Sequence, residues 1–281
     1  MTKFLGLLAF SLFMGLGLTA CNRSDNLEKL TLTGSSTVAP LASEIAKKFE
    51  AEHPDVRIDV QTGGSSRGLA DAAQGLADIG MVSRALKDSE TERFTSYAIA
   101  TDGIGIILAS SNPVSSLSDR QVVDIYTGKI DNWQQVGGTD APITVVNKAE
   151  GRSTLELFLN YFDLENSQIE ADVIIGDNQQ GIKTVAGNKN AIGYVSIGAA
   201  ERDISADVPL KLLSVGGVEA STATVRDGSF PLSRPLNLVT TETPLGLSKE
   251  FIEFAQSEKV HDLVEAQNFV PISPENVVQT P

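Results

Sequence analysis

The chain of 281 residues has one cysteine and two histidines. The single cysteine, Cys21, excludes a framework of internal disulfides and a thiolate metal site, and two distant histidines argue against a transition-metal site. Basic residues are also scarce: 22 Lys and Arg stand against 36 Asp and Glu, for a formal net charge of -14. Because binding to a phosphate backbone needs a basic face, we expect no nucleic-acid partner.

The sequence lacks the common nucleotide-binding signatures. Gly128-Lys129 is followed by Ile130 rather than by Ser or Thr, so the G-x-x-x-x-G-K-[ST] pattern is absent. Gly103 and Gly105 fall inside an apolar strand pattern and do not open a helix, which argues against a dinucleotide fingerprint. We therefore expect no cofactor.

A serine hydrolase is the enzyme class that the sequence leaves open. Residues 64–68 read Gly-Ser-Ser-Arg-Gly and match the G-x-S-x-G nucleophile elbow, with Ser66 as the nucleophile. A triad of that class also needs an acid and then a histidine further along the chain. His53 precedes the serine, and His261 lies in a helical pattern near the C-terminus. We therefore expect that the protein is not an enzyme. The alternative is a serine hydrolase that uses Ser66.

The N-terminus has the pattern of a processing signal. Lys3 precedes an apolar run over residues 4–18, which is too short to favour a transmembrane helix. The run ends in Leu18-Thr19-Ala20-Cys21, which resembles the lipobox of bacterial lipoproteins. That resemblance implies cleavage before Cys21 and attachment of lipid, palmitate included, to this residue. The alternative is an ordinary signal peptide with an incidental cysteine. We expect a signal peptide over residues 1–20 and a tether over 21–28.

Strand and helix patterns alternate along the rest of the chain. Leu41, Ile45 and Phe49 recur every four residues and predict a helix with one apolar face. The alternation predicts an α/β protein with mainly parallel strands, in one large domain or two smaller ones. We expect strands over residues 29–33, 56–61, 77–84, 97–109, 143–147, 173–175, 191–195, 210–213 and 236–240, and helices over 41–50, 69–74, 88–93, 119–126, 155–162, 180–186 and 248–266.

Three hydroxyl-rich turns join a strand end to a helix start: residues 33–40, 62–68 and 148–154. A helix start offers unpaired backbone N–H groups and the positive end of the helix dipole, so each turn suits an anion. Ligands of open α/β sheets bind at the carboxyl ends of strands, so the three turns form one site if they converge. The alternative is a plain helix cap, because Ser and Thr are preferred at any helix start.

Three charged residues extend this hypothesis. Arg84 and Arg152 are suited to gripping a tetrahedral oxyanion, because a guanidinium group binds two oxygens at once. Asp102 would repel an anion unless that anion has a proton to donate, so it would favour hydrogen phosphate over sulfate. The alternatives are a salt bridge for Arg84, a solvated loop charge for Arg152, and an ordinary turn at Asp102-Gly103.

Seven short motifs lie in order along the chain, at residues 34–41, 63–69, 77–84, 102–108, 125–133, 191–195 and 233–236. Together they resemble the phosphate-binding proteins of bacterial ABC transporters. The resemblance covers most of the chain after the leader. It implies a type 2 periplasmic-binding-protein fold, in which two α/β lobes joined by two hinge crossings close on phosphate and hand it to a membrane permease.

The resemblance also implies a set of phosphate contacts. Ser36, Thr37 and Ser65 match contact positions of the family, and Ser83-Arg84 matches a variant with arginine at that place. We infer that the carboxylate of Asp102 accepts the proton of the ligand in this variant. The predicted phosphate contacts are Ser35, Ser36, Thr37, Ser65, Ser83, Arg84, Asp102, Arg152, Ser153 and Thr154.

One contact region departs from the family pattern. Many members carry an arginine pair, an acidic residue and then Gly-Ser-Gly-Thr where this chain has residues 147–154. Lys148 takes an arginine position here, and Arg152 stands where serine is usual. This departure puts the affinity and the identity of the ligand in question more than the fold.

The domain organisation follows from the resemblance and from two loop-rich crossings. We expect lobe one over residues 29–110 with 232–281, and lobe two over 111–231. The predicted protein is a lipid-anchored monomer of the cell envelope, periplasmic or otherwise extracytoplasmic, that binds phosphate with high affinity, meets an ABC-transporter permease and catalyses no reaction. The alternative is a phosphate sensor or surface interaction protein on the same fold.

Overall fold

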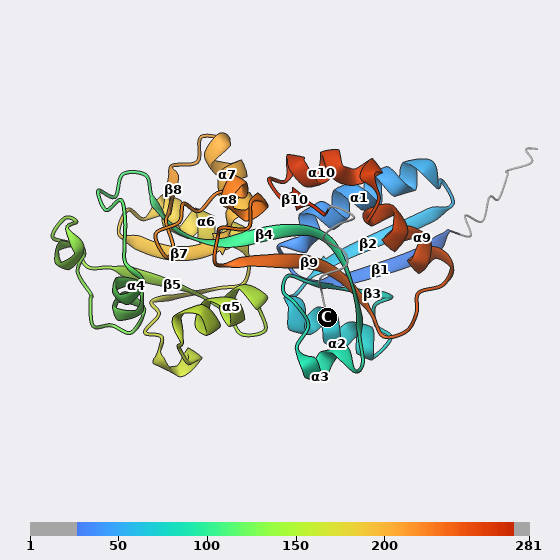
Figure 1. Cartoon of the computed structure of the whole chain (residues 1–281), viewed down its shortest axis with the longest axis horizontal. Coiled ribbons are helices and arrows are strands. Elements are labelled where there is room, and N and C mark those ends of the chain that lie inside the picture. Colours follow the sequence, from blue (N-terminus) through green and yellow to red (C-terminus); the bar gives the residue numbers. More distant parts are fainter. Residues whose placement is uncertain (1–26, 273–281) are drawn as a thin grey trace, which may run out of the picture.

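The computed structural model describes residues 27–272. The predicted signal peptide, Cys21 and most of the predicted tether lie outside these residues. Two lobes lie side by side along the long axis of the molecule, and strands β4 (Thr95–Ala109) and β9 (Ser233–Thr240) run between them (Figure 1). Within the described residues, no helix is both long enough and apolar enough to cross a membrane.

Lobe one is the half that contains the beginning and the end of the described chain (Figure 1). Its other strands are β1 (Glu28–Gly34), β2 (Val56–Thr62), β3 (Ile79–Val82) and β10 (Val270–Pro271). Its helices are α1 (Val38–Glu52), α2 (Ser65–Ala73), α3 (Asp88–Thr91), α9 (Gly246–Ala255) and α10 (His261–Ala266).

Lobe two is the half formed by the middle of the chain (Figure 1). Its strands are β5 (Thr144–Lys148), β6 (Val173–Ile175), β7 (Ala191–Ser196) and β8 (Leu210–Leu213). Its helices are α4 (Asp119–Tyr126), α5 (Ser153–Phe162), α6 (Asn178–Gly187), α7 (Ile197–Ser205) and α8 (Thr222–Arg226).

The strands form one continuous sheet of mixed direction, in the order β2-β1-β3-β9-β4-β7-β5-β6. β1 is parallel to β2 and β3, and β5 is parallel to β6 and β7. β9 is antiparallel to β3 and β4, and β4 is antiparallel to β7, β8 and β10. The prediction of mainly parallel strands is therefore wrong. An apolar run reports that a strand is buried on both faces and carries no information about its direction.

The long strand β4 belongs to both lobes. Its first part, up to Gly103, pairs with β9, and its second part, from Ile104, pairs with β7 and β8. β9 begins at Ser233, which lies opposite Gly103. The chain thus crosses between the lobes twice, through β4 and β9. The two crossings lie side by side, because these strands are paired.

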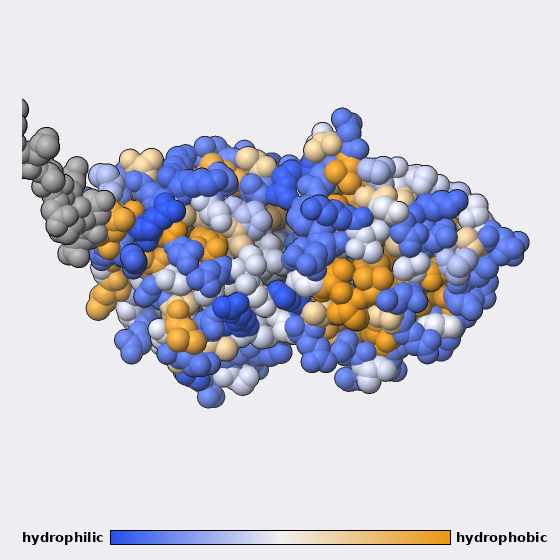
Figure 2. Space-filling model, turned by 180° about the vertical axis from the view of Figure 1, so that it is seen from behind, coloured by the Kyte–Doolittle hydropathy of each residue, from blue (hydrophilic) through white to orange (hydrophobic). Residues whose placement is uncertain are grey.

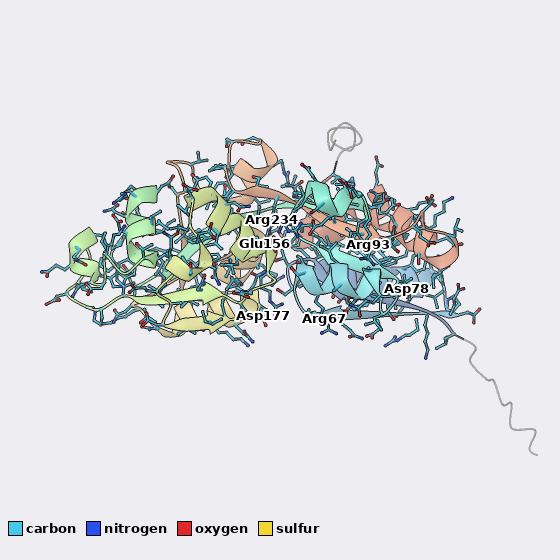
Figure 3. The ribbon with its side chains drawn as sticks, turned by 90° about the horizontal axis from the view of Figure 1, so that it is seen from below. Arg67, Asp78, Arg93, Glu156, Asp177 and Arg234 are labelled. Carbon is cyan, nitrogen blue, oxygen red and sulfur yellow. The ribbon has the colours of Figure 1, made fainter. Side chains whose placement is uncertain are left out.

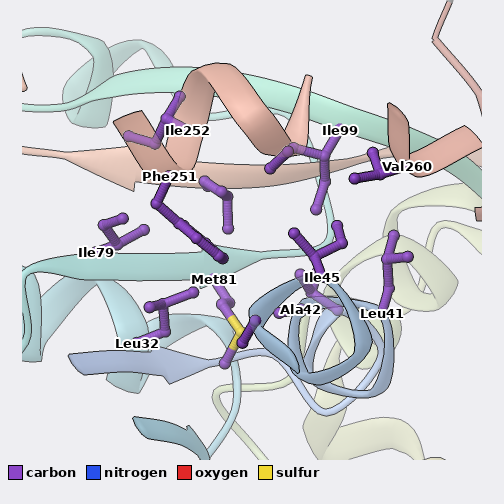
Figure 4. Close-up of a cluster of buried hydrophobic side chains, with 14 of the residues drawn as sticks. Leu32, Leu41, Ala42, Ile45, Ile79, Met81, Ile99, Phe251, Ile252 and Val260 are labelled. Carbon is purple, nitrogen blue, oxygen red and sulfur yellow. The ribbon is translucent and has the colours of Figure 1, made fainter. Parts of the chain in front are cut away.

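Each lobe has its own apolar core. In lobe one, Leu41, Ile45 and Phe49 of α1 are buried against β-sheet and α9 side chains, which confirms the predicted apolar face (Figure 4). In lobe two, the rings of Phe158 and Tyr194 stack with centroids 3.9 Å apart. Two separate cores allow the lobes to move as bodies without exposing either core.

Three helical segments differ from the prediction, and one of them is α8, which was not predicted. The single helix expected over 248–266 is divided into α9, a 3-10 turn (Glu258–Val260) and α10. Helix α7 was not predicted, because it follows β7 directly with no turn residues between them. The side chain of Ser196 caps it by accepting a hydrogen bond from the N–H of Ala199 at 3.2 Å.

Candidate functional site

Three helix N-termini meet at the boundary between the lobes. Helices α1, α2 and α5 follow the carboxyl ends of β1, β2 and β5, where ligands bind in open α/β sheets. A small cavity lies at this place. It is lined by Ser35, Ser36, Thr37, Gly64, Ser65, Ser83, Arg152, Ser153 and Thr154. The structure thus brings together eight of the ten predicted contacts, since Arg84 and Asp102 are absent from that lining.

Lobe one contributes hydroxyls that also cap and join its elements. The hydroxyl oxygen of Ser35 accepts hydrogen bonds from the N–H groups of Thr37 at 3.1 Å and Val38 at 3.4 Å. The hydroxyl oxygen of Ser65 accepts from the N–H of Ser83 at 3.2 Å, which ties the start of α2 to the end of β3. The same side chain can therefore cap the start of a helix and line the cavity.

Lobe two contributes the start of α5. The hydroxyl oxygen of Ser153 and the Nε atom of Arg152 are buried and have no hydrogen-bond partner in the described part of the chain. Such a pair is costly unless something else binds it, because a buried polar group without a partner loses its hydration. The N–H of Ser66 in lobe one donates to the carbonyl of Gly151 at 3.2 Å, so the two lobes are in direct contact beside the cavity.

Arg234 lies behind the cavity and joins hydroxyls from both lobes. It is 2% exposed. Its Nη1 donates to the hydroxyl of Thr154 at 2.9 Å, and its Nη2 donates to the hydroxyl of Thr37 at 3.2 Å. Burial lowers the pKa of Arg234 from its usual value, and the nearby carboxylate of Asp102 opposes this effect. Arg234 is the residue of the site that sequence reasoning missed, although the Ser-Arg-Pro-Leu motif contains it.

Asp102 is the partner of Arg234 and not part of the cavity lining. Its Oδ2 lies 2.9 Å from Nη2 of Arg234, and its Oδ1 accepts from the N–H of Gly198 at 3.2 Å. Both carboxylate oxygens therefore have a partner within the protein. Its role as acceptor of a ligand proton stays a prediction.

Arg84 is not among the residues that line the cavity, and its guanidinium pairs with carboxylates. Its Nη1 and Nη2 donate to the two carboxylate oxygens of Glu90 at 2.7 and 2.8 Å. Its Nε lies 3.1 Å from a carboxylate oxygen of Glu156 in lobe two. The salt bridge that was the alternative for Arg84 is thus present in the structure.

Lys148 is a further buried cationic side chain near Arg234. The Nζ of Lys148 donates to the side-chain oxygen of Asn178 at 3.1 Å, and the amide nitrogen of Asn178 donates to the hydroxyl of Thr37 at 3.0 Å. Burial, with a smaller contribution from the charge of Arg234, lowers the pKa of Lys148 from its usual 10.5 to about 7. The surroundings of the cavity thus contain more buried cationic groups than carboxylates.

The hydrogen bonds around the cavity determine whether its hydroxyls are left to donate or to accept a hydrogen bond from a ligand. The Thr37 oxygen accepts from both Asn178 and Arg234, and the Thr154 oxygen accepts from Arg234. The Ser35 oxygen accepts from two backbone N–H groups. A hydroxyl whose oxygen already accepts keeps its hydrogen to donate. These side chains are therefore poised as donors, which suits an anion with several oxygens.

The charged side chains labelled in Figure 3 include Glu156 and Arg234 at the boundary between the lobes. Among residues 27–272, no group of three or more His, Cys, Asp or Glu side chains is arranged to hold a metal ion. The geometry of the described site is thus that of a cavity built mainly from hydroxyls, backbone N–H groups and cations.

Known proteins resemble this chain in sequence and in fold. Residues 21–259 match the family described as the PBP superfamily domain. A chain described as a phosphate ABC transporter substrate-binding protein with bound phosphate, from Clostridium perfringens, is 35% identical, with a TM-score of 0.81 over 88% of this chain and 100% of that one. An ABC-type phosphate transport receptor from Vibrio cholerae is 30% identical, with a TM-score of 0.71 over 86% of this chain and 100% of that one. The class of protein is thus the two-lobed α/β binding protein, as predicted.

Relatives narrow this class to one family. The phosphate-binding protein PstS of Bacillus subtilis is 30% identical over 249 residues, which are 87% of this chain and 81% of that protein. The phosphate-binding protein PstS of Borreliella burgdorferi is 27% identical over 261 residues, which are 90% of this chain and 93% of that protein. The chain belongs to the PBP superfamily and, within it, to the phosphate-binding proteins of ABC transporters, which confirms the family that the motifs predicted.

Proposed function

We propose that this protein binds inorganic phosphate in the cavity between its lobes and delivers it to the permease of an ABC transporter. The observation that carries the proposal is the set of donors around the cavity: three helix N-termini together with hydroxyls whose oxygens already accept hydrogen bonds. Backbone N–H groups at helix starts favour anions. The relatives described as phosphate-binding proteins support phosphate as the particular anion.

The predicted contacts Ser35, Ser36 and Thr37 would surround the anion from lobe one, and Ser153 and Thr154 from lobe two. Their placement in one cavity supports this assignment. Ser65, Ser83 and Arg152 line the same cavity and complete the proposed site. Arg234 would act from behind, because its guanidinium orients the hydroxyls of Thr37 and Thr154.

Delivery requires that the cavity opens. We place the hinge in the paired strands β4 and β9, because the strand pairing changes from one lobe to the other there. The proposed first boundary between Gly103 and Ile104 comes earlier than the predicted one after residue 110, whereas the second, at Leu232–Ser233, is close to the predicted one before residue 232.

On the face in Figure 2, the broadest hydrophobic area lies on lobe two, beside the boundary between the lobes. The contacts that join the lobes at the cavity are polar: the N–H of Ser66 with the carbonyl of Gly151, and Arg234 with the hydroxyls of Thr37 and Thr154. Polar contacts favour lobes that separate and close again.

The remaining assignments rest on the sequence. Cys21 would carry the lipid that anchors the protein outside the cytoplasm, after removal of residues 1–20, and the protein would act as a monomer. It would catalyse no reaction. In support, His53 stacks on Phe49 with ring centroids 4.1 Å apart, and His261 begins α10; within residues 27–272, no hydrogen bond joins either histidine to Ser66.

Titration calorimetry with phosphate, arsenate, sulfate and molybdate near neutral pH tests the proposal. We expect saturable binding of one phosphate per chain. Absence of phosphate binding by the folded protein would overturn the proposal. A fluorophosphonate probe tests the hydrolase alternative, and we expect no labelling of Ser66.

A further inference from the structure

A group of four charged side chains joins the lobes on the side of α3 and α5. We call this group the interlobe ion-pair network; it comprises Arg84, Lys87 and Glu90 of lobe one and Glu156 of lobe two. The Nζ of Lys87 lies 2.8 Å from Glu156, and the Nε of Arg84 lies 3.1 Å from the same carboxylate oxygen. Glu90 holds Arg84 in place with bonds of 2.7 and 2.8 Å.

Burial makes this network stronger than an ordinary surface pair. The side chain of Arg84 is 4% exposed, and that of Glu156 is 22% exposed. Charge pairs interact more strongly where water is partly excluded, whereas exposed pairs contribute little. Burial opposes the charge on Glu90, yet the hydrogen bonds from Arg84 and from the N–H of Lys87, together with the charges of these two residues, outweigh it and lower the pKa of Glu90. Because the pKa of Arg84 is raised and that of Glu90 is lowered, these two side chains stay ionised near neutral pH.

The network is linked to the cavity through the first turn of α5. Glu156 lies in the first turn of α5, three residues after Ser153, which lines the cavity and whose buried hydroxyl has no hydrogen-bond partner among the described residues. Contacts to Glu156 from lobe one therefore hold the start of α5 in the position that closes the cavity. They form only when the lobes are together, because Arg84 and Lys87 belong to one lobe and Glu156 to the other.

We propose that Arg84 and Lys87 bind Glu156 across the lobe boundary, stabilise the closed conformation and thereby set how slowly the bound anion leaves. This inference rests on the proposed function, since the anion is the phosphate of the cavity. An interaction present only in the closed state shifts the equilibrium toward that state and lowers the dissociation rate. Arg84 thus acts on the ligand through α5, as a positioning residue.

The decisive variant is Glu156→Gln, which keeps the shape of the side chain and removes its charge. We expect phosphate dissociation, measured by stopped flow, to become about 3- to 30-fold faster, as expected for the loss of a partly buried pair. The matched control is Glu250→Gln, which removes the same charge from an exposed position of α9. It should dissociate at the wild-type rate.

A second variant keeps the test valid if Glu156→Gln folds poorly. Lys87→Gln changes a side chain that is 58% exposed, so the fold should tolerate it. Lys87→Gln should also speed dissociation, and the two changes combined should have less than the product of their separate effects, because they remove one interaction. Equal dissociation rates in wild type and both variants would overturn the inference.

Small-angle X-ray scattering separates this inference from the proposed function. If the wild type does not bind phosphate, the proposed function fails, and the network is judged on the ligand-free protein alone. In that case Glu156→Gln must have a larger radius of gyration than wild type and Glu250→Gln. An unchanged radius there would overturn the role of the network in closure.

Discussion

The guanidinium of Arg234 lies 2.9 Å from the carboxylate of Asp102, and both side chains are almost completely buried. The two residues are 132 positions apart in the sequence and stand on the paired strands β9 and β4. Asp102 compensates the charge of Arg234, which allows the guanidinium to donate to Thr37 of lobe one and Thr154 of lobe two. The pair therefore sits at the hinge strands and supports the cavity from behind.

Asp102→Asn tests both roles of this carboxylate. We expect the free energy of unfolding to fall by about 3–5 kcal/mol, because Arg234 is left as a buried charge without a counter-charge. Chemical denaturation measures this loss. A double variant with Arg234→Gln should recover part of it, since no buried charge then remains unpaired.

The same variant decides whether Asp102 accepts a proton of the ligand. That role predicts weaker discrimination of phosphate against sulfate in Asp102→Asn, measured as the ratio of the two dissociation constants. Unchanged selectivity would refute the proton-acceptor role and leave Asp102 as the counter-charge of Arg234.

Ser153→Ala removes a buried hydroxyl that has no hydrogen-bond partner within residues 27–272. Hydrogen bonds to charged groups contribute about 1.5–3 kcal/mol, so we expect phosphate affinity to fall about 10- to 100-fold. Without phosphate, the melting temperature should hardly change, because no hydrogen bond within the protein is lost. Ser116→Ala, in an exposed loop, is the control. Equal phosphate affinity in Ser153→Ala and wild type would remove Ser153 from the site.

Gly64→Ala places a methyl group between the lobes. The φ of Gly64 is +99°, and its Cβ would lie 2.7 Å from the carbonyl oxygen of Gly151 and 2.9 Å from Cδ of Arg152. We expect phosphate affinity to fall by at least about tenfold, or ~1.4 kcal/mol, since the lobes cannot approach fully. Calorimetry measures the change.

The control for this variant separates backbone strain from the clash. Gly137 also has a positive φ, of +83°, and a Cβ there would meet nothing within 4 Å. Gly137→Ala should therefore lose stability through strain alone and bind phosphate normally. If both variants lower affinity equally, the closing of the lobes at Gly64 is not the cause.

Lys148→Met tests how much the burial of the Lys148 amine lowers the free energy of unfolding. The pKa of Lys148 is about 7 in the fold against 10.5 in the usual environment. Between these pH values the unfolded chain binds more protons than the folded one, so this residue makes the stability of the ligand-free wild type rise with pH across that window. The slope is at most about 1.4 kcal/mol per pH unit.

The pH slope of unfolding should therefore shrink in Lys148→Met, and the variant should gain most stability relative to wild type near pH 7 and below. Denaturant unfolding at pH 6.5 and pH 9, without phosphate, measures this. Lys183→Met, at an exposed position of α6, should keep the wild-type slope. Identical slopes in wild type and Lys148→Met would show that the amine titrates normally.

Much of the local structure could be predicted because it depends on near neighbours. The spacing of Leu41, Ile45 and Phe49 sets one face of α1, and that face is buried as expected. The three turns at strand ends also begin helices as predicted. Strand direction could not be predicted in this way, since β4 and β9 resemble other buried strands in composition and differ only in their partners.

Charged residues were the harder case. Ser83 and Arg84 are adjacent, and the motif suggested both as contacts, yet they lie in the bend that follows β3 and have different surroundings. Ser83 lines the cavity and Arg84 pairs with Glu90 and Glu156. No role was predicted for Arg234, because its partners Thr37, Asp102 and Thr154 are far from it in the sequence.

The sequence by itself determined the α/β class, the family and the hydroxyl-rich helix starts around residues 34–37, 64–66 and 152–154, because periodicity, capping chemistry and motif order are local properties of the chain. The tertiary structure decided which cationic side chains contact the residues around the cavity and which form ion pairs elsewhere. Arg234 reaches the cavity through Thr37 and Thr154, whereas Arg84 turns to the lobe boundary. The physical reason is that the pairing of a buried charge depends on strand register and lobe contact, which bring together residues that are far apart in sequence.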